Sequence, residues 1–552
     1  MKRCWCVSAW AVICVWCLGR TLQGGHEARF SQEQRAYWAF QPVNPPSVPE
    51  VSLRHRVRTP IDAFVLERLE KQGLSLDSPA EKHEWLRRAK FDLLGLPPTP
   101  EEIERFIGDD SAGAYERLID EFLASPHYGE AWGRHWLDLV RYAETAGFNA
   151  DPLRPLAYKY RDYVIRAFNA DTPYDRFIQE QIAGDELFPE SEDALIATGY
   201  NVMWPDESNA SDILLARQEA LNDLTANVGS VFLGLSIGCA QCHDHKFDPI
   251  LQTDFYQLQA FFAGIVPVES VPVGSHDALA DYQRKLRAWL EETAAVRNEL
   301  HGLESTAMAM AGREKRMKFP PIVLDAIDTP VEHRTAVQRQ FAFWSQRQIT
   351  VSDQELEAQW TTSQKTRRDE LRQRRAELEK QKPQPPGRLA AWVGTEVQSE
   401  PPATHLLAGG GYQRPLQEAP PGFPVALVNG ASNLAKVTSP RLGTSGRRTA
   451  LAKWLSDPGN PLTARVMVNR IWQGHFGRGI VADANDFGTQ TEPPMHPELL
   501  DWLASEFVAR GWSIKEMHRL IMLSEVYRQS SHRRSAEQPD HHGMEVDPAN
   551  TL

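Results

Sequence analysis

Cysteine and long hydrophobic runs are scarce in this sequence, and basic residues are outnumbered by acidic ones. Six cysteines in 552 residues are too few for the disulfide framework of a small secreted scaffold. Lys and Arg number 60 against 73 Asp and Glu, for a net charge of −13, which argues against a protein that coats nucleic acid, because that binding depends on clustered positive charge. After the amino terminus no stretch reaches the roughly 20 apolar residues that span a bilayer. We therefore expect no nucleic-acid partner and no membrane span after signal removal.

The remaining composition, 42% hydrophobic and 24% charged, is close to the average of globular proteins. The length predicts about three to four domains of roughly 150 residues each. Apolar residues recur at helical spacing, as in Ile61, Phe64, Val65 and Leu69 after Pro60, and proline suits the first turn of a helix. We predict a mainly α, multidomain helical protein with a helical-hairpin insert and a small β-containing segment.

The amino terminus has the pattern of a secretory signal. Lys2 and Arg3 precede an apolar run over 4–18, and small residues follow. The run of about 15 apolar residues is short of a bilayer span. We expect a signal peptide over 1–25 and a periplasmic or otherwise extracytoplasmic location, with an uncleaved N-terminal anchor as the alternative. Four of the six cysteines lie in this signal.

Composition and periodicity divide the rest of the chain into segments. Apolar residues between Tyr282 and Leu303 advance by 4 and 3 in alternation, and Leu371 and Leu378 lie seven apart in a second polar helix. These spacings are typical of a coiled-coil seam. An intramolecular helical hairpin is the favoured interpretation, and a dimerising coil is the alternative. The predicted segments are a Pro-rich extended arm (26–59), a helical domain (60–265), a helical hairpin (276–386), a small β segment (388–440), a second helical domain (441–532) and a disordered tail (533–552).

Three local patterns carry finer predictions. Helical spacing over 132–143 places Asp138 and Arg141 on one helix, where such charges usually form ion pairs. In the β segment, the three glycines 409–411 lack the Lys-Ser/Thr of a phosphate-binding loop and predict a turn. The short apolar run 423–428 favours β structure.

The two cysteines that lie beyond the signal fall in one motif, Cys239-Ala-Gln-Cys242-His243. In c-type haem attachment, thiols three positions apart add to the two vinyl groups, and the adjacent imidazole ligates the iron. An exported chain fits this chemistry, since c-type haem is normally assembled outside the cytoplasm. We therefore predict haem c, held by Cys239 and Cys242 with His243 as ligand of the iron.

A haem at this motif needs a second axial ligand or an open distal site. The sequence offers His127, His135, Met203 and His245 as candidates and gives no way to choose among them. His245 lies too close in the chain to reach the opposite face of the haem, and a second-shell role suits it better. For His135 the alternative is a hydrogen-bonded histidine on an amphipathic helix.

Three other interpretations of the cysteine pair stay open. A disulfide between Cys239 and Cys242 suits an oxidising compartment. Cys239, Cys242, His243 and His245 together are plausible ligands for zinc or iron. The third is simple burial of the thiols beside the apolar run 231–237. A Gly-x-Ser-x-Gly pattern over 234–238 lacks the strand that a serine hydrolase needs before it.

Several sequence blocks follow one another in a recognisable order. In the first helical domain they are 91–100, 128–130, 135–142, 168–175, 181–185 and 239–249, and in the second they are 451–455, 460–470, 475–479, 486–488 and 496–502. The first set resembles the planctomycete cytochrome c-like domain, and the second resembles the domain of unknown function that usually follows it. The resemblance covers roughly 35–265 and 440–532. It implies an exported protein whose haem is inferred and whose biochemical role is not settled.

The chain departs from that family pattern in two respects. Many members carry a separate cytochrome c domain ahead of these two, whereas here Pro60 follows soon after the signal. Any haem must then bind at 239–243. Members also usually continue beyond the point where this chain stops, so we expect the second domain to be truncated.

The leading functional hypothesis is a c-type-haem-binding protein in periplasmic electron transfer or haem-based redox chemistry, with an unidentified redox partner. The first alternative is a metal-dependent enzyme, such as a hydrolase of extracellular polymers, using the Cys-His-Asp cluster with Arg470, Asp486 and His496. The second is a non-catalytic assembly protein with a C-x-x-C disulfide and an exported protein partner. No catalytic residue is assigned.

Overall fold

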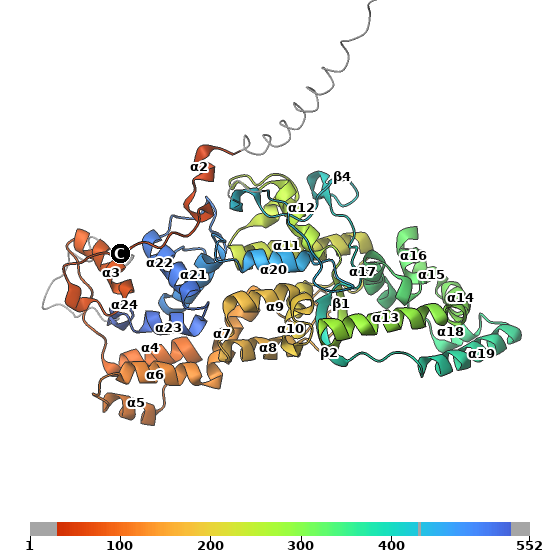
Figure 1. The fold of residues 1–552 in the computed structure, drawn as a ribbon, viewed down its shortest axis with the longest axis horizontal. Helices are drawn as coiled ribbons and strands as arrows, with labels where there is room; N and C mark the ends of the chain where they lie inside the picture. The colour runs from red at the N-terminus through yellow and green to blue at the C-terminus, as the bar shows by residue number, and fades with distance from the viewer. Residues whose placement is uncertain (1–29, 149, 429–431, 531–552) are drawn as a thin grey trace, which may run out of the picture.

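The computed structural model describes residues 30–148, 150–428 and 432–530. The signal peptide expected over 1–25 and the tail expected over 533–552 lie outside these residues. The chain forms an elongated stack of helices with two small sheets, which confirms the mainly α prediction (Figure 1). Within the described residues, no helix is both long enough and apolar enough to cross a membrane.

Helices from both ends of the chain build one end of the molecule. The early helices, red and orange in Figure 1, lie beside the late helices, which are blue. Buried apolar side chains from both sets join one continuous core. The early helices are α3 (Pro60–Lys71), α4 (Lys82–Leu94), α5 (Pro100–Ile107) and α6 (Ala114–Ala124); the late ones are α21 (Thr463–Phe476), α22 (Pro497–Ala509), α23 (Ile514–Met522) and α24 (Glu525–Arg528).

Local signals start these helices. The helix predicted at Pro60 begins there, with proline in its first turn. At α5, the Thr99 side chain accepts a hydrogen bond from the Glu102 N–H, and the Glu102 carboxylate accepts one from the Thr99 N–H at 2.7 Å. Such a reciprocal capping box satisfies two backbone donors that the helix leaves unpaired.

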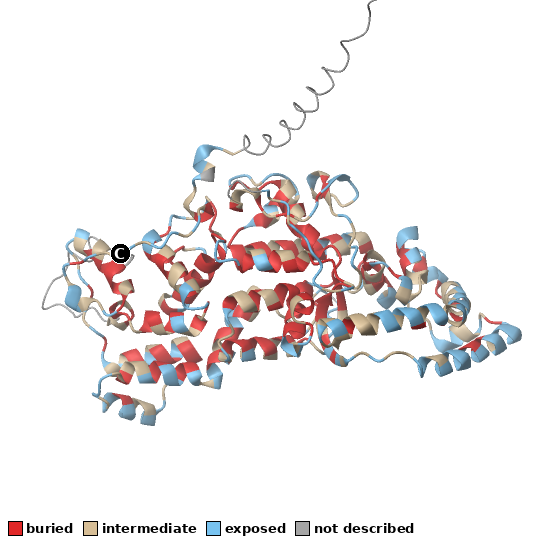
Figure 2. Ribbon diagram, in the orientation of Figure 1, coloured by how far each residue is buried: buried red, intermediate tan, exposed pale blue. Residues whose placement is uncertain are grey.

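The centre of the molecule is a layer of largely buried helices (Figure 2). Helix α11 is buried around most of its circumference, as expected of a helix at the centre of a core. Gly184 lets α9 approach the next helix, because a Cβ there would lie 2.0 Å from the Ala194 carbonyl oxygen. The central helices are α7 (Pro126–Leu139), α8 (Tyr158–Asn169), α9 (Tyr174–Leu187), α10 (Glu192–Ala197), α11 (Ile213–Leu233), α12 (Gln252–Gln259) and α20 (Arg447–Leu455).

Helix α7 ends at Leu139, so the prediction of a helix over 132–143 is wrong at its carboxyl end. Arg141 adopts a left-handed backbone with φ +60°, which a continuing right-handed helix does not allow. Its guanidinium instead lies 2.7 Å from the Asp223 carboxylate of α11. A contact with a distant residue therefore accompanies the end of this helix, which local spacing could not reveal.

The insert projects from the other end of the molecule, and its outer helices are largely exposed (Figures 1 and 2). Helix α14 packs beside α19, and Arg367 and Arg372 of α19 pair with Glu299 and Glu304 of α14 at 2.7 Å each. The long apolar seam expected around Thr293 is divided there between two helices. The insert contains α13 (His276–Glu292), α14 (Ala294–Ala311), α15 (Arg313–Arg316), α16 (Pro321–Asp328), α17 (Ala336–Ser345), α18 (Asp353–Glu357) and α19 (Thr362–Glu379).

Two antiparallel strand pairs accompany the insert. Strand β1 (Val266–Val273) precedes the insert and pairs with β2 (Gly387–Thr395), which follows it, so the pair closes the base of the insert. Strand β3 (His405–Leu407) pairs with β4 (Pro415–Glu418). The run 423–428 forms a 3-10 turn, η9 (Val425–Leu427), where a strand was expected. Phe423 is held there by stacking on Trp454, with ring centroids 4.5 Å apart.

Residues 30–59 cross the second helical domain as an arm with little regular structure, containing α2 (Gln32–Arg35) and the short turns η1 (Trp38–Phe40) and η2 (Arg54–Arg56). Arg465 of α21 donates to the Gln41 carbonyl at 2.8 Å, and its guanidinium lies 5.6 Å from the Trp38 ring centroid.

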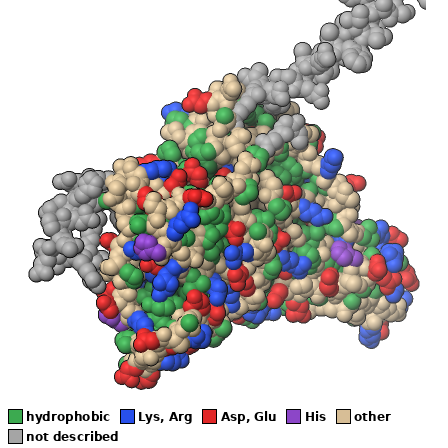
Figure 3. Space-filling model, turned by 60° about the vertical axis from the view of Figure 1, so that its left-hand side comes forward, with side chains coloured by type: hydrophobic (Ala, Val, Ile, Leu, Met, Phe, Trp, Pro, Cys, Tyr) green, Lys and Arg blue, Asp and Glu red, His purple; other side chains and the backbone are tan. Residues whose placement is uncertain are grey.

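In the view of Figure 3, acidic and basic side chains are interleaved over this end of the molecule.

Candidate functional site

The C-x-x-C-H motif follows the long central helix α11. That helix ends at Gly234, whose backbone is left-handed with φ +57°. A Cβ at Gly234 would lie 2.8 Å from the Phe487 ring and 2.9 Å from Val466, so glycine is required for this close approach. The chain then enters η4 (Ile237–Gln241), which carries Cys239 and ends at Cys242. Both thiols are exposed, and they are not bonded to each other.

Helix α12 holds the backbone of the motif. Gln252 donates from Nε2 to the Gln241 carbonyl at 3.0 Å and to the Leu407 carbonyl at 2.8 Å. The Tyr256 hydroxyl donates to the same Gln241 carbonyl at 2.8 Å. Burial, with a smaller contribution from Cys242, raises the pKa of Tyr256, so this hydroxyl keeps its proton and remains a donor. The motif is therefore anchored to α12 and to the β3–β4 hairpin.

A glycine turn lies directly against one of the thiols. Gly410, in the turn η8 (Ala408–Gly410), has φ +74°, and a Cβ on it would lie 2.7 Å from Cys242 Sγ. The run of glycines predicts this turn from the sequence. The sequence carries no signal that the turn packs on Cys242, because the two segments are far apart in the chain.

His243 is exposed, and one of its ring nitrogens is engaged. Its Nδ1 lies 2.7 Å from the backbone carbonyl oxygen of Asp244. A carbonyl only accepts, so Nδ1 must carry the proton, and Nε2 is then the nitrogen with a free lone pair. Metal-binding histidines commonly use this arrangement, in which the second ring nitrogen donates to a carbonyl group.

His245 serves a contact between the two helical domains. Its Nδ1 accepts from the Asp248 N–H at 2.9 Å and lies 3.2 Å from the Asp248 carboxylate. Asp248 in turn accepts from the Thr489 N–H at 2.7 Å and from the Thr489 hydroxyl at 2.8 Å. A Cβ on Gly488 would lie 2.5 Å from the Asp248 carboxylate. The end of the motif therefore docks on the 486–489 loop of the second domain.

The other ligand candidates lie on other elements. Met203 is 1% exposed and follows the 3-10 helix η3 (Thr198–Val202) in the core. His135 lies exposed on α7, with its ring centroid 5.3 Å from that of Trp132. His127, also on α7, lies 2.7 Å from the Glu130 carboxylate. None of the three lies on an element that carries the cysteines.

The four-ligand zinc or iron site is not assembled. In the described part of the chain, no group of three or more His, Cys, Asp and Glu side chains is placed to hold a metal ion. The Nδ1 atom of His245 is engaged with Asp248 and does not complete a metal site with the cysteines.

Of the second-domain residues, Arg470 donates to the carbonyl oxygens of Val231 and of Ser230, the latter at 2.8 Å. These hydrogen bonds secure the end of α11.

The residues of the motif do fit a c-type haem. Covalent attachment needs two reachable thiols at this spacing, and both Cys239 and Cys242 are exposed. An iron ligand needs a ring nitrogen with a free lone pair, and the Asp244 carbonyl leaves Nε2 of His243 in that state. Gly410 keeps the space beside Cys242 free of a side chain.

A buried carboxyl group lies close to the motif. Asp254, in the first turn of α12, accepts from the Leu251 N–H at 2.9 Å and is 1% exposed. Burial, with a smaller contribution from Asp244, raises the pKa of Asp254 to about 7. The charge on Asp254 therefore changes near neutral pH.

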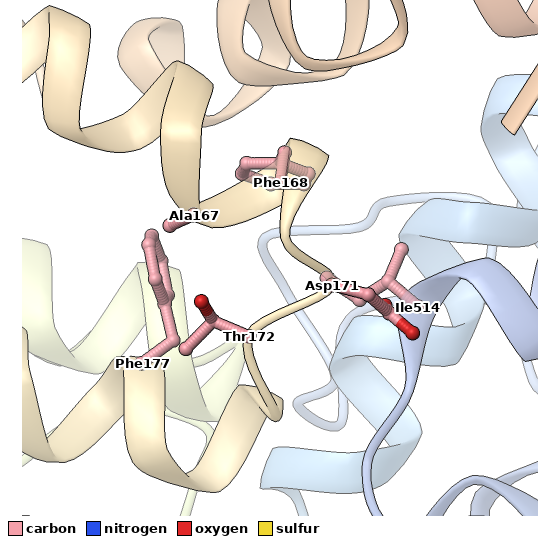
Figure 4. Close-up of a pocket in the computed structure, with 6 residues that line it drawn as sticks. All are labelled: Ala167, Phe168, Asp171, Thr172, Phe177 and Ile514. Atoms are coloured by element: carbon pink, nitrogen blue, oxygen red, sulfur yellow. The ribbon is translucent and has the colours of Figure 1, made fainter. Parts of the chain in front are cut away.

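The crevice in Figure 4 is a packing gap. It lies between the turn that joins α8 to α9 and the start of α23, and its volume of about 10 Å³ holds at most one water molecule. Phe177, Thr172 and Ile514 close it from different elements. It has no room for an organic ligand.

Comparison with known protein families matches each of the two helical domains to a family model. The fold and the motif define a mainly helical protein in which one C-x-x-C-H segment lies where two helical domains meet. Residues 60–266 match PSCyt2, described as a protein of unknown function (DUF1549), and residues 447–552 match PSD1, described as a protein of unknown function (DUF1553). The chain belongs to the family that combines this planctomycete cytochrome-like domain with its companion domain. No curated protein and no solved structure matches the chain.

Proposed function

We propose that this protein binds one haem c at Cys239 and Cys242, with His243 as an axial ligand, and acts in electron transfer or haem-based redox chemistry outside the cytoplasm. The observation that carries the proposal is the pairing of two exposed thiols with a histidine whose Nδ1 is fixed by the Asp244 carbonyl. When bound, a haem supplies one-electron chemistry at its iron.

The chain's own residues have separate tasks in this proposal. Cys239 and Cys242 hold the group covalently, and His243 offers Nε2 to the iron. Gln252 and Tyr256 fix the backbone between the cysteines through the Gln241 carbonyl. Exposure of the motif keeps the distance to a redox partner short. A change of charge on Asp254 near pH 7 would alter the electrostatic cost of oxidation, since a nearby carboxylate stabilises the oxidised iron.

The test is expression of the chain with the machinery that attaches c-type haem, alongside a known c-type cytochrome as loading control. We expect a Soret band that stays with the polypeptide through denaturation and acid–acetone extraction, because thioether bonds are covalent. The double variant Cys239→Ser with Cys242→Ser should lose the band entirely. His243→Ala should keep covalent haem and change the ligand-sensitive bands, whereas His83→Ala, on an exposed part of α4, should change neither.

A wild-type chain that stays free of covalent haem, while the control cytochrome is loaded, would contradict the proposal. Retention of the band in the double cysteine variant would contradict the assignment of the site. Both results are separable from misfolding by circular dichroism of the same preparations, since the fold is mainly helical.

A further inference from the structure

A cavity of about 610 Å³ lies where the first helical domain, the insert and strand β2 meet. This volume is in the range of pockets that hold small organic ligands. Its wall is built by six separate parts of the chain and contains none of the cysteine motif. The lining residues are Ala146, Pro152, Leu153, Arg154, Asp206, Ser208, Asn209, Glu269, Lys318, Phe343, Arg347, Gln348 and Trp392.

Two partly buried aromatic rings form one side of the cavity. Trp392 of β2 and Phe343 of α17 have ring centroids 6.1 Å apart, with their planes inclined at 43°. Guanidinium groups lie against both rings: Arg347 is 4.2 Å from the Phe343 centroid, and Arg154 is 6.0 Å from that of Trp392. The wall therefore combines flat apolar surface with positive charge.

The charges in the cavity are unevenly compensated. Asp206 is buried and binds Arg347 through both carboxylate oxygens, at 2.7 and 3.0 Å, while Trp344 donates to it at 2.8 Å. Its carboxylate is therefore paired directly with Arg347. Lys318 adds an exposed ammonium group, and Glu269 on β1 adds an exposed carboxylate.

Arg154 has no direct ion-pair partner, and the carboxylates of Asp206 and Asp151 act on it only from beyond contact distance. It is 7% exposed, and Nη2 donates to the Trp204 carbonyl at 2.7 Å. Its Nε has no hydrogen-bond partner, and among the described residues it forms no ion pair. A buried guanidinium in this state is costly. An anion in the cavity would remove that cost, because a charged hydrogen bond is among the strongest that a protein makes.

The loop that supplies Arg154 is also strained. Phe148 and Asp151 have φ of +61° and +32°, a region that non-glycine residues rarely adopt. Such conformations persist where the surrounding structure enforces them and are frequent at binding sites. Phe148 is 56% exposed, so packing of its side chain does not explain the strain.

We propose that this cavity binds an acidic sugar unit, with its carboxylate or sulfate group at Arg154 and a face of its ring against Trp392. The ring fits the flat apolar wall, as sugar rings present C–H groups on one face. Ser208 and Asn209 supply the hydroxyl and amide groups that sugar hydroxyls need as partners, whereas the Gln348 amide is already bonded to Lys318, Ala210 and Trp344. A free inorganic anion would leave most of the cavity and both aromatic rings unused.

The test is isothermal titration calorimetry of the full chain with a galacturonate trisaccharide, a sulfated disaccharide, a neutral galactose trisaccharide and sodium sulfate. We expect binding of at least one acidic saccharide and at least roughly tenfold weaker binding of the neutral one, as expected for loss of a charged hydrogen bond. The two acidic probes tell a carboxylate from a sulfate site. Binding that is equal for the neutral sugar, or equal for sulfate alone, would overturn the proposal.

Three variants locate the binding site. Arg154→Gln and Trp392→Leu should each weaken the acidic saccharide roughly tenfold, and the exposed Lys318→Gln should weaken it severalfold with little risk to folding. Lys380→Gln is the control: it removes an exposed lysine of the same insert that pairs with Glu377 at 2.8 Å and should leave the affinity unchanged. Unchanged affinity in both Lys318→Gln and Trp392→Leu, with wild-type melting temperatures, would place binding elsewhere and refute the proposal.

Discussion

Cys242 shows how a single residue position can depend on a distant one. Gly410 lies far along the chain, yet its missing side chain is what leaves room for the thiol. The neighbouring Gly409 has a similar left-handed backbone, with φ +58°, but the nearest atom to a Cβ there is 3.5 Å away on Arg414. Comparing substitutions at Gly409 and Gly410 therefore separates the cost of backbone strain from the cost of a clash with sulfur.

Gly410→Ala should destabilise the protein more than Gly409→Ala. Both pay for a left-handed backbone, roughly 1–2 kcal/mol, but only Gly410→Ala also meets Cys242 Sγ, which adds roughly 1–3 kcal/mol. Urea unfolding of the haem-free protein measures the difference, and the reaction rate of the thiols with Ellman's reagent should fall only in Gly410→Ala. Equal stability and equal thiol reactivity of the two variants would show that the turn does not pack on Cys242.

At the scale of elements, buried histidines join α4, α21 and α23. His475 Nε2 lies 2.8 Å from His518 Nδ1, and its other ring nitrogen lies 3.4 Å from Asp92. Tyr527 donates to the same Asp92 carboxylate at 2.7 Å. The Trp132 ring packs on His518 with centroids 4.1 Å apart. These contacts tie the first helical domain to the second.

This cluster predicts a loss of stability in acid. Burial first, and then the nearby His475, His135 and Lys515, lower the pKa of His518 well below its ordinary value of 6.5. The unfolded chain therefore takes up a proton near pH 6.5 while the folded chain does not. Stability from this group is complete above pH 6.5 and is lost as the pH falls toward the folded pKa, by roughly 1 kcal/mol per pH unit.

The measurement is urea unfolding at pH 7.5, 6.5 and 5.5. His518→Gln should be less stable at pH 7.5 and should lose less further stability between pH 6.5 and 5.5 than the wild type does. His127→Gln removes an exposed histidine from α7 and should follow the wild-type pH dependence. A His518→Gln profile parallel to that of the wild type would show that His518 does not cause the acid sensitivity.

At the scale of the whole molecule, a buried ion cluster locks the two helical domains. Arg448 of α20 donates to Asp185 of α9 at 2.7 and 2.9 Å and lies 3.0 Å from Glu186. All three side chains are buried. Thr449 donates to the Glu186 carboxylate from its backbone at 3.0 Å and from its hydroxyl at 2.6 Å. The two domains are therefore expected to unfold together.

Removing the shared cation should weaken both domains at once. Arg448→Met leaves two buried carboxylates without their main partner and should cost roughly 3–5 kcal/mol, the usual result of breaking a buried pair. Arg510→Met breaks the partly exposed pair with Glu506 and should cost under about 1 kcal/mol. Urea unfolding measures the loss of stability in each variant, and limited proteolysis shows whether both domains are affected. Equal effects of the two variants would mean that the cluster does not join the domains.

Much of the helical fold could be predicted from local patterns. The start at Pro60 needs only the residues around it, because capping and the apolar period act within one or two turns. The end of α7 could not be predicted, since Arg141 leaves the helix to reach Asp223. The pairing of β1 with β2 could not be predicted from the sequence either, because the whole insert separates the two strands.

The sequence by itself determined the helical class, the starts of its helices and the chemistry available at Cys239, Cys242 and His243, since these depend on residue type and short-range spacing. Only the tertiary structure decided what surrounds them. It assigned His245 to the contact with the second domain, placed Gly410 against Cys242, and left Arg154 beside a cavity without a direct ion-pair partner. The physical reason is that burial and charge compensation depend on residues brought together from distant parts of the chain. Periodicity in the sequence does not reveal which distant residues come into contact.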